Sequence, residues 1–303
     1  MNNEFPKREA LPPLPAANPR ESKTHKRKIS WWEEFRGLIA MLALVLGFHT
    51  FIAKPFYIPS ISMMPSLLVG DQLIVSKYPY GWSWVSPSFH IFPRSTTRFF
   101  GRTPAYGDIV IVVPPGSKED YIKRVVALPG DRIAVRNGQI ILNGKPVPQT
   151  VEPPVQIPAD DALRCDGGPC YTAFADYRTR LPNGHEVYEL PTYREVLPNG
   201  ATYLIIDHMN QPLDNYAEIK VPEGHVFLMG DDRDHSADSR APVEELGLGG
   251  PVPLSDVGGR AEFITFSLNG TQSWNPLTWW GALRGDRAMT SLRPPHVEKM
   301  LEQ

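Results

Sequence analysis

The hydrophobic pattern of the chain has one long apolar segment near its start, and only short apolar runs after it. The segment falls in residues 37–54, and its apolar part, 37–53, spans about 26 Å as a helix, close to the roughly 30 Å hydrocarbon core of a bilayer. Trp31 and Trp32 precede it and Lys54 follows it, which suits the two membrane interfaces. The pattern predicts one transmembrane helix that anchors the protein.

Residues 1–36 are a polar tail that becomes basic towards the apolar segment, with Lys23, Lys26, Arg27, Lys28 and Arg36. A cleaved signal peptide has the same order of charge and apolarity. The length of the basic tail, and the lack of a small-x-small cleavage site before residue 58, favour an anchor instead. By the positive-inside rule we expect the tail in the cytoplasm and residues 55–303 on the outer side.

Short aliphatic and β-branched runs, separated by turn signals, continue after the anchor. Gly107-Asp108 and Pro129-Gly130-Asp131 are turn signals, and Asn137-Gly138 is a hairpin signal. The high proline content, 32 residues, disfavours a helical bundle. A mainly β protein with an antiparallel sheet is therefore predicted from the runs at 72–77, 109–113, 121–128, 132–135, 139–142, 225–229 and 258–267.

Changes in composition divide the chain into regions. Residues 55–147 and 223–270 carry most of the strand-like runs and are expected to form one core in two parts. Residues 148–222 are polar and Pro-rich, and we expect an inserted, smaller β subdomain there. Residues 271–303 are aromatic and basic, which suits either a segment on the membrane surface or one docked on the core.

Charge and cysteine content exclude some classes of function. The formal net charge of −2 argues against a nucleic-acid-binding surface. Cys165 and Cys170 flank the turn sequence Asp166-Gly167-Gly168-Pro169, and can form a disulfide in an oxidising compartment. A zinc site is disfavoured because no second Cys/His pair at ligand spacing accompanies them. Neither a metal nor a cofactor is expected.

Residues 58–67, directly after the anchor, carry two serines at a spacing of two. In an extended backbone the hydroxyls of Ser60 and Ser62 point to the same face, and Pro59 and Pro65 restrict the backbone around them. A Pro/Ser-rich linker has the same composition. A nucleophilic serine is the sharper interpretation, and it requires a base.

Lys123 is the candidate base, because it interrupts the apolar run 121–128. A single lysine in a strand usually lies at an exposed or edge position. A buried lysine behaves differently, since loss of solvation lowers its pKa. A drop of about 2–3 units, costing roughly 3–4 kcal/mol, makes it a base near neutral pH.

Other catalytic patterns are weak in this sequence. It has no Gly-x-Ser-x-Gly elbow, His-Glu-x-x-His motif, P-loop or Gly-x-Gly-x-x-Gly fingerprint. His235 and Asp238 can be combined with Ser62 as a triad, but no local feature supports that arrangement. The charged run 230–240, taken alone, is typical of a solvated loop.

Four stretches, in this order, resemble the motifs of bacterial type I signal peptidases, over about residues 37–267. They are Ile58-Pro59-Ser60-Ile61-Ser62-Met63-Met64-Pro65-Ser66-Leu67, Gly107-Asp108-Ile109-Val110, Tyr121-Ile122-Lys123-Arg124-Val125-Val126-Ala127-Leu128-Pro129-Gly130-Asp131 and Gly230-Asp231-Asp232-Arg233-Asp234-His235-Ser236-Ala237-Asp238-Ser239-Arg240. One such stretch is unspecific, whereas four together are very specific. The resemblance implies an antiparallel β-sheet catalytic domain with a smaller β insertion, preceded by one transmembrane helix.

The resemblance also implies catalytic roles, position by position. Ser62 matches the nucleophile and Lys123 its neutral base. Ser60 matches the serine whose hydroxyl helps the Ser62 backbone N–H to stabilise the oxyanion. Ser236 matches the serine that orients the lysine amine.

Further implied roles concern the surroundings of these groups. Two structural pairs are implied near the site, Asp231 with Arg124 and Asp238 with Arg240. Shallow substrate pockets for small side chains are implied to be lined by Phe56, Ile58, Met63, Leu67, Tyr121 and Ile122.

The sequence departs from the family pattern at four positions. Asp232 and His235 stand where Asn is common, Ala127 where Gly is common, and Ser66 where Thr is usual. None of these changes removes a catalytic group. An additional acid and a titrating histidine near the site are expected to affect the pH dependence of activity.

We therefore expect a membrane-bound serine endopeptidase that removes signal peptides from exported preproteins after small residues, at Ala-x-Ala ends. Its expected partners are signal peptides, membrane lipid and the protein-translocation machinery, at a bacterial inner membrane with the catalytic domain in the periplasm. Two alternatives remain: a Ser/Lys protease that processes one dedicated partner, or a non-catalytic, membrane-tethered scaffold.

Overall fold

The structure, a computed structural model, describes residues 31–90, 92–165, 168–170 and 172–297. The chain divides into two compact units, Met1–Leu42 and Ala43–Gln303. The first 30 residues of the predicted basic tail, and the end of the predicted C-terminal segment after residue 297, lie outside the described residues.

Helix α1 (Trp31–Phe51) contains most of the predicted anchor. It has 21 residues, and within the described residues it is the one helix whose length and composition suit a membrane span. It begins earlier than the predicted segment 37–54, with Glu33 and Glu34 in its first turn, where acidic side chains favour a helix start. It also ends earlier, because the chain enters strand β1 at Ala53.

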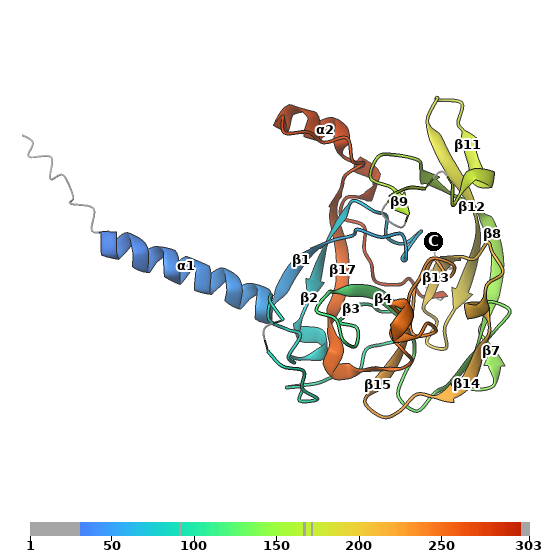
Figure 1. The fold of residues 1–303 in the computed structure, drawn as a ribbon, viewed down its shortest axis with the longest axis horizontal. Coiled ribbons are helices and arrows are strands. Elements are labelled where there is room, and N and C mark those ends of the chain that lie inside the picture. The colour runs from blue at the N-terminus through green and yellow to red at the C-terminus, as the bar shows by residue number, and fades with distance from the viewer. Residues whose placement is uncertain (1–30, 91, 166–167, 171, 298–303) are drawn as a thin grey trace, which may run out of the picture. The chain divides into compact units, whose positions relative to one another are not determined.

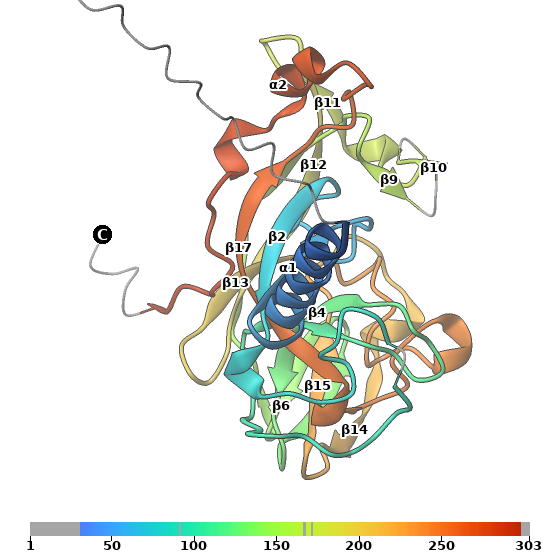
Figure 2. The same cartoon turned by 90° about the vertical axis from the view of Figure 1, so that its left-hand side faces the viewer.

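A seven-stranded sheet is the largest element of the second unit. Its order is β1–β2–β17–β3–β4–β15–β16, and each neighbouring pair is antiparallel, which confirms the predicted fold class. Figure 2 shows β2 and β17 side by side, although they are far apart in the sequence. The strands are β1 (Ala53–Tyr57), β2 (Asp71–Ser76), β3 (Ile109–Val112), β4 (Tyr121–Ala127), β15 (His225–Met229), β16 (Val252–Pro253) and β17 (Val257–Ser267).

Three smaller sheets complete the unit (Figure 1). One has the order β14–β5–β6–β7, from β5 (Arg132–Arg136), β6 (Gln139–Leu142), β7 (Lys145–Pro146) and β14 (Tyr216–Lys220). In another, the long β12 (Glu186–Val196) pairs with β8 (Gln149–Pro158), β11 (Arg178–Arg180) and β13 (Thr202–Ile206). The third pairs β9 (Arg164–Cys165) with β10 (Gly168–Pro169). The region 148–222 thus supplies β8 to β14, and its last strand joins the sheet of residues 132–146.

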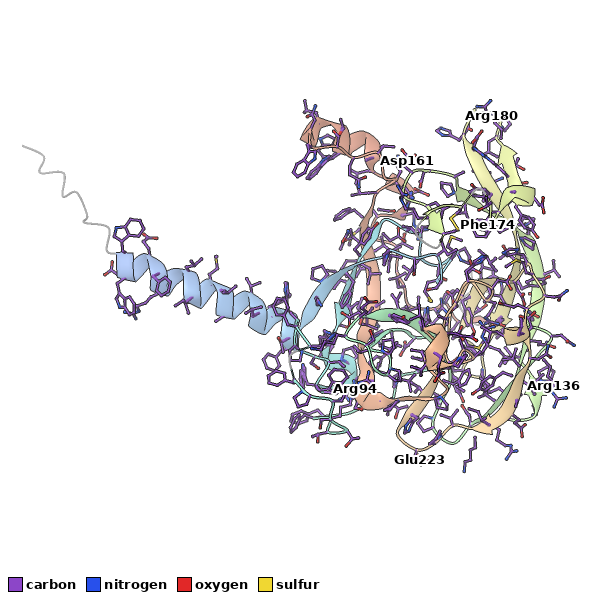
Figure 3. All side chains as sticks on the ribbon, viewed as in Figure 1. Arg94, Arg136, Asp161, Phe174, Arg180 and Glu223 are labelled. Carbon is purple, nitrogen blue, oxygen red and sulfur yellow. A yellow bond between two sulfur atoms is a disulfide. The ribbon has the colours of Figure 1, made fainter. Side chains whose placement is uncertain are left out.

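Strand β4 lies in the interior of the large sheet, between β3 and β15. All its residues after Tyr121 are buried. Figure 3 shows side chains filling the space between the sheets, with Phe174 pointing inward and Arg136 and Arg180 pointing to solvent. Lys123 therefore does not occupy the edge position that an isolated lysine in a strand usually takes.

Three ion pairs connect the C-terminal segment to the rest of the second unit. Arg284 pairs with Asp160, Arg287 with Asp71 and Arg293 with Glu262. The segment also holds the short helix α2 (Trp279–Ala282), and the side chains of Trp274, Trp279 and Trp280 are exposed. Its basic residues thus dock it on the core, while its tryptophans face outward.

Candidate active site

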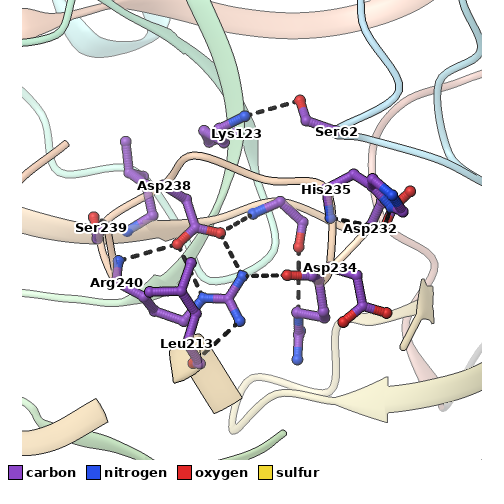
Figure 4. A network of polar contacts seen from close by, with 12 residues as sticks. Ser62, Lys123, Leu213, Asp232, Asp234, His235, Asp238, Ser239 and Arg240 are labelled. Atoms are coloured by element: carbon purple, nitrogen blue, oxygen red, sulfur yellow. Dashed lines mark hydrogen bonds and ion pairs between the residues drawn. The ribbon is translucent and has the colours of Figure 1, made fainter. Parts of the chain in front are cut away.

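Ser62 and Lys123 are brought together from distant parts of the chain. Ser62 lies in the loop between β1 and β2, and Lys123 lies in β4. The Lys123 Nζ donates a hydrogen bond of 2.8 Å to the Ser62 Oγ (Figure 4). Both residues are almost fully buried, with 6% of Ser62 and 3% of Lys123 exposed. A hydroxyl and an amine at this distance can exchange a proton.

The buried environment changes the basicity of Lys123. Loss of solvation lowers its pKa from 10.5 to about 8, although nearby carboxylates, above all Asp238, oppose the shift. The amine is therefore partly neutral near neutral pH, and a neutral amine can accept a proton. This is the property that the sequence argument required of a buried lysine.

Ser60 lies beside the nucleophile candidate, at the exposed side of the site. Its Oγ is 3.4 Å from the Ser62 Oγ. Neither residue belongs to a strand, so the loop, rather than a regular extended backbone, brings the two hydroxyls together. The pair places two hydroxyl groups at one point of the site, as the spacing predicted.

The loop 230–240 lies beside Ser62 and Lys123. Most of its side chains are buried, so it is not the solvated loop that its charges suggest. Asp238 accepts hydrogen bonds from the Arg240 Nε (3.0 Å) and Nη2 (2.9 Å) and from the Gly230 N–H (3.0 Å) (Figure 4). Burial raises the pKa of Asp238, but the Arg240 charge and these donors outweigh it and hold the pKa below its ordinary value. The pair predicted from the sequence is thus present as a fully buried ion pair.

Gly230 allows this loop to approach the nucleophile loop. A Cβ atom at Gly230 would collide with the Ser236 side chain and with the Ser62 carbonyl oxygen. The same carbonyl accepts a hydrogen bond from the Asp232 N–H (3.2 Å). Ser236 is buried beside these groups, and its Oγ has no hydrogen-bond partner among the described residues. Its hydroxyl does not contact Lys123 through a hydrogen bond in this structure.

Arg124, whose side chain lies on the face of β4 opposite to Lys123, connects the loop that holds Ser62 and the loop 230–240 to the sheet. It forms a bidentate pair with Asp231, at 2.7 and 2.6 Å. It also donates to the Gly107 carbonyl (2.7 Å) and to the Ser66 Oγ (3.0 Å). Four acceptors on three segments make this buried guanidinium a structural centre, as the pairing of Asp231 with Arg124 implied.

A cavity of about 310 Å³ opens at the Ser62–Lys123 pair. Four of the six residues expected to form substrate pockets line it: Phe56, Ile58, Tyr121 and Ile122. Met63 and Leu67 do not line it. They are completely buried in the hydrophobic cluster that also contains Ile58 and Ile122.

Sequence reasoning did not single out several residues that line the same cavity: Glu119, Asp120, Ala237 and Leu246. The two acids precede β4 and could have been found from their place next to Tyr121. Ala237 and Leu246 carry no signal in the sequence, because only the folding of their loops brings them to the cavity. His235, noted in the sequence as a departure from the family, also lines it.

Two further groups of side chains have the residue types of ligand or redox sites. Cys165 and Cys170 are joined in a disulfide. Among the described residues, Asp207, Asp214 and Asp234 bring one carboxylate oxygen each within 4.8 Å of one another. Burial and the neighbouring carboxylates raise the pKa of Asp207 to about 6. A proton bound to Asp207 can therefore relieve the repulsion among the three carboxylates. Their proximity is the single feature that suggests a metal.

Comparisons with known proteins bear on the family of the chain. The family model for signal peptidase, peptidase S26, matches residues 31–266. A signal peptidase I of Rickettsia typhi (strain ATCC VR-144 / Wilmington) is 33% identical over 259 residues, which covers 82% of this chain and 82% of the relative. One of Rickettsia conorii (strain ATCC VR-613 / Malish 7) is 32% identical over 262 residues, which covers 86% and 85%.

A crystal structure of a signal peptidase I from Enterococcus faecalis V583 is 21% identical and covers 52% of this chain and 97% of that chain, with a TM-score of 0.26. The family match and the Rickettsia relatives together show that the chain belongs to the signal peptidase family, peptidase S26, and is a serine endopeptidase.

Proposed function

We propose that this endopeptidase uses Ser62 as its nucleophile and Lys123 as its general base, and that it removes signal peptides from exported preproteins. The observation that carries the proposal is the 2.8 Å hydrogen bond between the Lys123 Nζ and the Ser62 Oγ inside a cavity. Burial lowers the pKa of Lys123 to about 8, so the amine can act as a base without a histidine or a carboxylate partner.

The first half of the reaction forms an ester. The Ser62 Oγ attacks the scissile carbonyl carbon while its proton moves to the Lys123 amine. The oxyanion is stabilised by the Ser62 N–H and the Ser60 hydroxyl. The C–N bond then breaks, the Lys123 ammonium gives its proton to the leaving amine, and the mature protein departs.

The second half releases the signal peptide. Lys123, neutral again, takes a proton from water, and the hydroxide attacks the ester carbon. The Ser62 Oγ leaves with the proton, and the signal peptide departs with a free carboxyl end. In this scheme the pairs Asp231–Arg124 and Asp238–Arg240 hold the surrounding loops in place, and the buried Ser236 hydroxyl, which has no hydrogen-bond partner among the described residues, is available to orient the amine during the reaction.

The surroundings of the dyad support the proposed substrate and its location. Phe56, Ile58, Tyr121 and Ile122 leave shallow apolar space for small side chains before the scissile bond, as in an Ala-x-Ala end. We place α1 across a bacterial inner membrane, with the N-terminus in the cytoplasm and the site on the outer side. That side is oxidising, which suits the Cys165–Cys170 disulfide. Lipid and the translocation machinery are the proposed neighbours.

The test is cleavage of a secretory preprotein with an Ala-x-Ala end by the detergent-purified full chain, beside Ser62→Ala and Lys123→Ala. Both variants are expected to lose cleavage while their thermal unfolding remains cooperative. The matched control is Lys77→Ala, which removes the amine of another buried lysine and should leave cleavage in place.

Two outcomes would contradict the proposal. Cleavage by Lys123→Ala at the wild-type rate would exclude the lysine base. No cleavage of any secretory preprotein by the wild type, together with cleavage of one dedicated membrane partner, would favour the narrower processing role.

A further inference from the structure

A second cavity, of about 580 Å³, adjoins the one that contains the dyad. Both cavities share part of their walls, formed by Pro59, Ser60, His235, Ala237 and Leu246. Ser62 and Lys123 line the first cavity only. The two spaces therefore meet at a wall that includes Ser60, whose Oγ lies 3.4 Å from the Ser62 Oγ.

A peptide that is cut at Ser62 must extend to both sides of its scissile bond. The first cavity lies between the end of β1 and the start of β4, where the proposed function places the residues before the bond. The chain after the bond must leave in another direction, past the shared wall. The second cavity, which shares that wall, offers such a space among the described residues.

We propose that the second cavity binds the first residues of the mature protein, directly after the scissile bond, and that Arg164 and Glu245 select their charge. This inference rests on the proposed function and deepens it, because it assigns a subsite to the half of the substrate that is released. The ligand is an extended polypeptide segment, recognised by its side-chain charge.

The shared wall is held firmly in place at His235. Its Nδ1 lies 3.1 Å from the Asp232 Oδ1, and its backbone N–H donates to the same oxygen at 3.1 Å. Its ring stacks on His208, with centroids 5.5 Å apart, and meets Phe174 edge-on at 5.2 Å. A ring fixed on several sides gives the passage between the cavities a defined shape.

Arg164 and Glu245 are two charged residues that line the second cavity. Both are exposed, and neither forms an ion pair with any described residue. Asp234 also lines the second cavity, but its Oδ2 accepts hydrogen bonds from the His208 N–H (2.6 Å) and the Met209 N–H (3.1 Å). Arg164 is therefore expected to favour acidic residues, and Glu245 basic ones.

The experiment compares substrates with Lys or Asp at each of the first four positions after the scissile bond. The quantity measured is the ratio of kcat/KM for the Lys substrate to that for the Asp substrate. Arg164→Glu should raise this ratio and Glu245→Lys should lower it, each on the order of fivefold at low salt. The effect should shrink at 1 M salt, because the charges are exposed.

Matched controls are Arg136→Glu and Glu223→Lys, which make the same changes in net charge. Both residues are exposed and line neither cavity (Figure 3). Their ratios should stay near that of the wild type. If the controls shift the ratio as much as Arg164→Glu and Glu245→Lys do, general electrostatics explains the effect and the subsite is excluded.

A binding measurement separates this inference from the proposed mechanism. Fluorescently labelled Lys and Asp substrates are titrated onto Ser62→Ala, with and without Arg164→Glu, and the ratio of the two Kd values is compared. This readout needs no cleavage. An unchanged ratio overturns the subsite even if the dyad is correct, and a changed ratio supports the subsite even if Lys123 proves not to be the base. A charge effect confined to residues before the scissile bond would also overturn it.

Discussion

Lys123 and Lys77 are two buried lysines in one catalytic unit, and they differ in what their amines meet. Lys77 directly follows β2, and only 2% of it is exposed, against 3% of Lys123. Burial lowers the pKa of each amine to about 8. The Lys123 amine donates to the Ser62 Oγ at 2.8 Å, whereas the Lys77 Nζ lies 5.8 Å from the Phe56 ring and forms no hydrogen bond with any described residue.

The difference separates two requirements for a lysine base. Burial sets the pKa, and the fold meets this requirement at both positions. A base for a nucleophile also needs contact with a hydroxyl group. Of the two amines, only that of Lys123 has such a contact among the described residues. A lowered lysine pKa therefore does not identify an active site without the partner group.

The largest expected effect is on catalysis. Lys123→Met should lower kcat for preprotein cleavage by on the order of a thousandfold or more, because it removes the proton acceptor. Lys77→Met, the same substitution at the second lysine, should change kcat less than about threefold. Single-turnover cleavage measures both, and equal losses in the two variants would break the comparison.

The pH dependence of kcat/KM should follow the titration of Lys123 and not that of Lys77. Only its neutral form accepts the serine proton, so kcat/KM should rise about tenfold per pH unit below the pKa of about 8 and level off above it. Lys77→Met should keep this rising limb unchanged. The measurement is a pH profile between pH 6 and 10, and a limb that disappears in Lys77→Met would assign it to the wrong amine.

The free energy of unfolding should depend on the charge of Lys77. Its pKa is lower in the folded than in the unfolded chain, so the folded state binds fewer protons and wild-type stability rises with pH from about 8 to 10.5. Near pH 7, Lys77→Met should raise the free energy of unfolding by up to about 3 kcal/mol, and the gain should fade above pH 10.5.

Urea unfolding at pH 7 and pH 10.5 measures this difference. Lys77→Arg serves as the control, because its charge persists at both values and should lower the stability. A gain for Lys77→Met that is the same at both pH values would contradict the assignment to the buried charge.

The smallest effect concerns the electrostatic neighbours of the two amines. Asp120 raises the pKa of Lys77, whereas the carboxylates that raise that of Lys123 are Asp238, Asp231 and Asp232. Asp120→Asn should therefore lower the pKa of Lys77 by less than about one unit and leave that of Lys123 in place. NMR of lysine-labelled protein resolves the two titrations, and equal shifts would show that the sites are coupled.

Local patterns in the sequence predicted much of the fold. The apolar runs and turn signals gave the positions of β3, β4, β15 and β17 and the antiparallel class, because strand formation depends on short-range composition. They could not give the order of the strands. The pairing of β2 with β17 joins residues almost 200 positions apart, and such contacts depend on burial of the whole sheet.

For the candidate site, the sequence predicted the serines and the lysine better than the residues that line the cavity. Ser60, Ser62 and Lys123 were recognised from spacing and resemblance, and they converge. Met63 and Leu67 were expected on the pocket wall, but they are completely buried and do not line the cavity, although Ile58 of the same hydrophobic cluster does. A pattern of apolar residues in a loop does not distinguish the surface of a pocket from the core beneath it. No sequence pattern marks Lys77 as buried, because a lysine at the end of a strand is usually exposed.

The sequence by itself predicted the apolar helix, the β class, the serine pair and Lys123 as the candidate base, because these depend on residue type and spacing along the chain. The tertiary structure alone decided that Lys77 and Lys123 are both buried and that the Lys123 amine reaches the Ser62 Oγ, how loop 230–240 approaches Ser62 through Gly230, and where the second cavity opens. Each of these is a contact between segments distant in sequence. Such contacts are fixed by close packing and desolvation in the folded core, which no local pattern records.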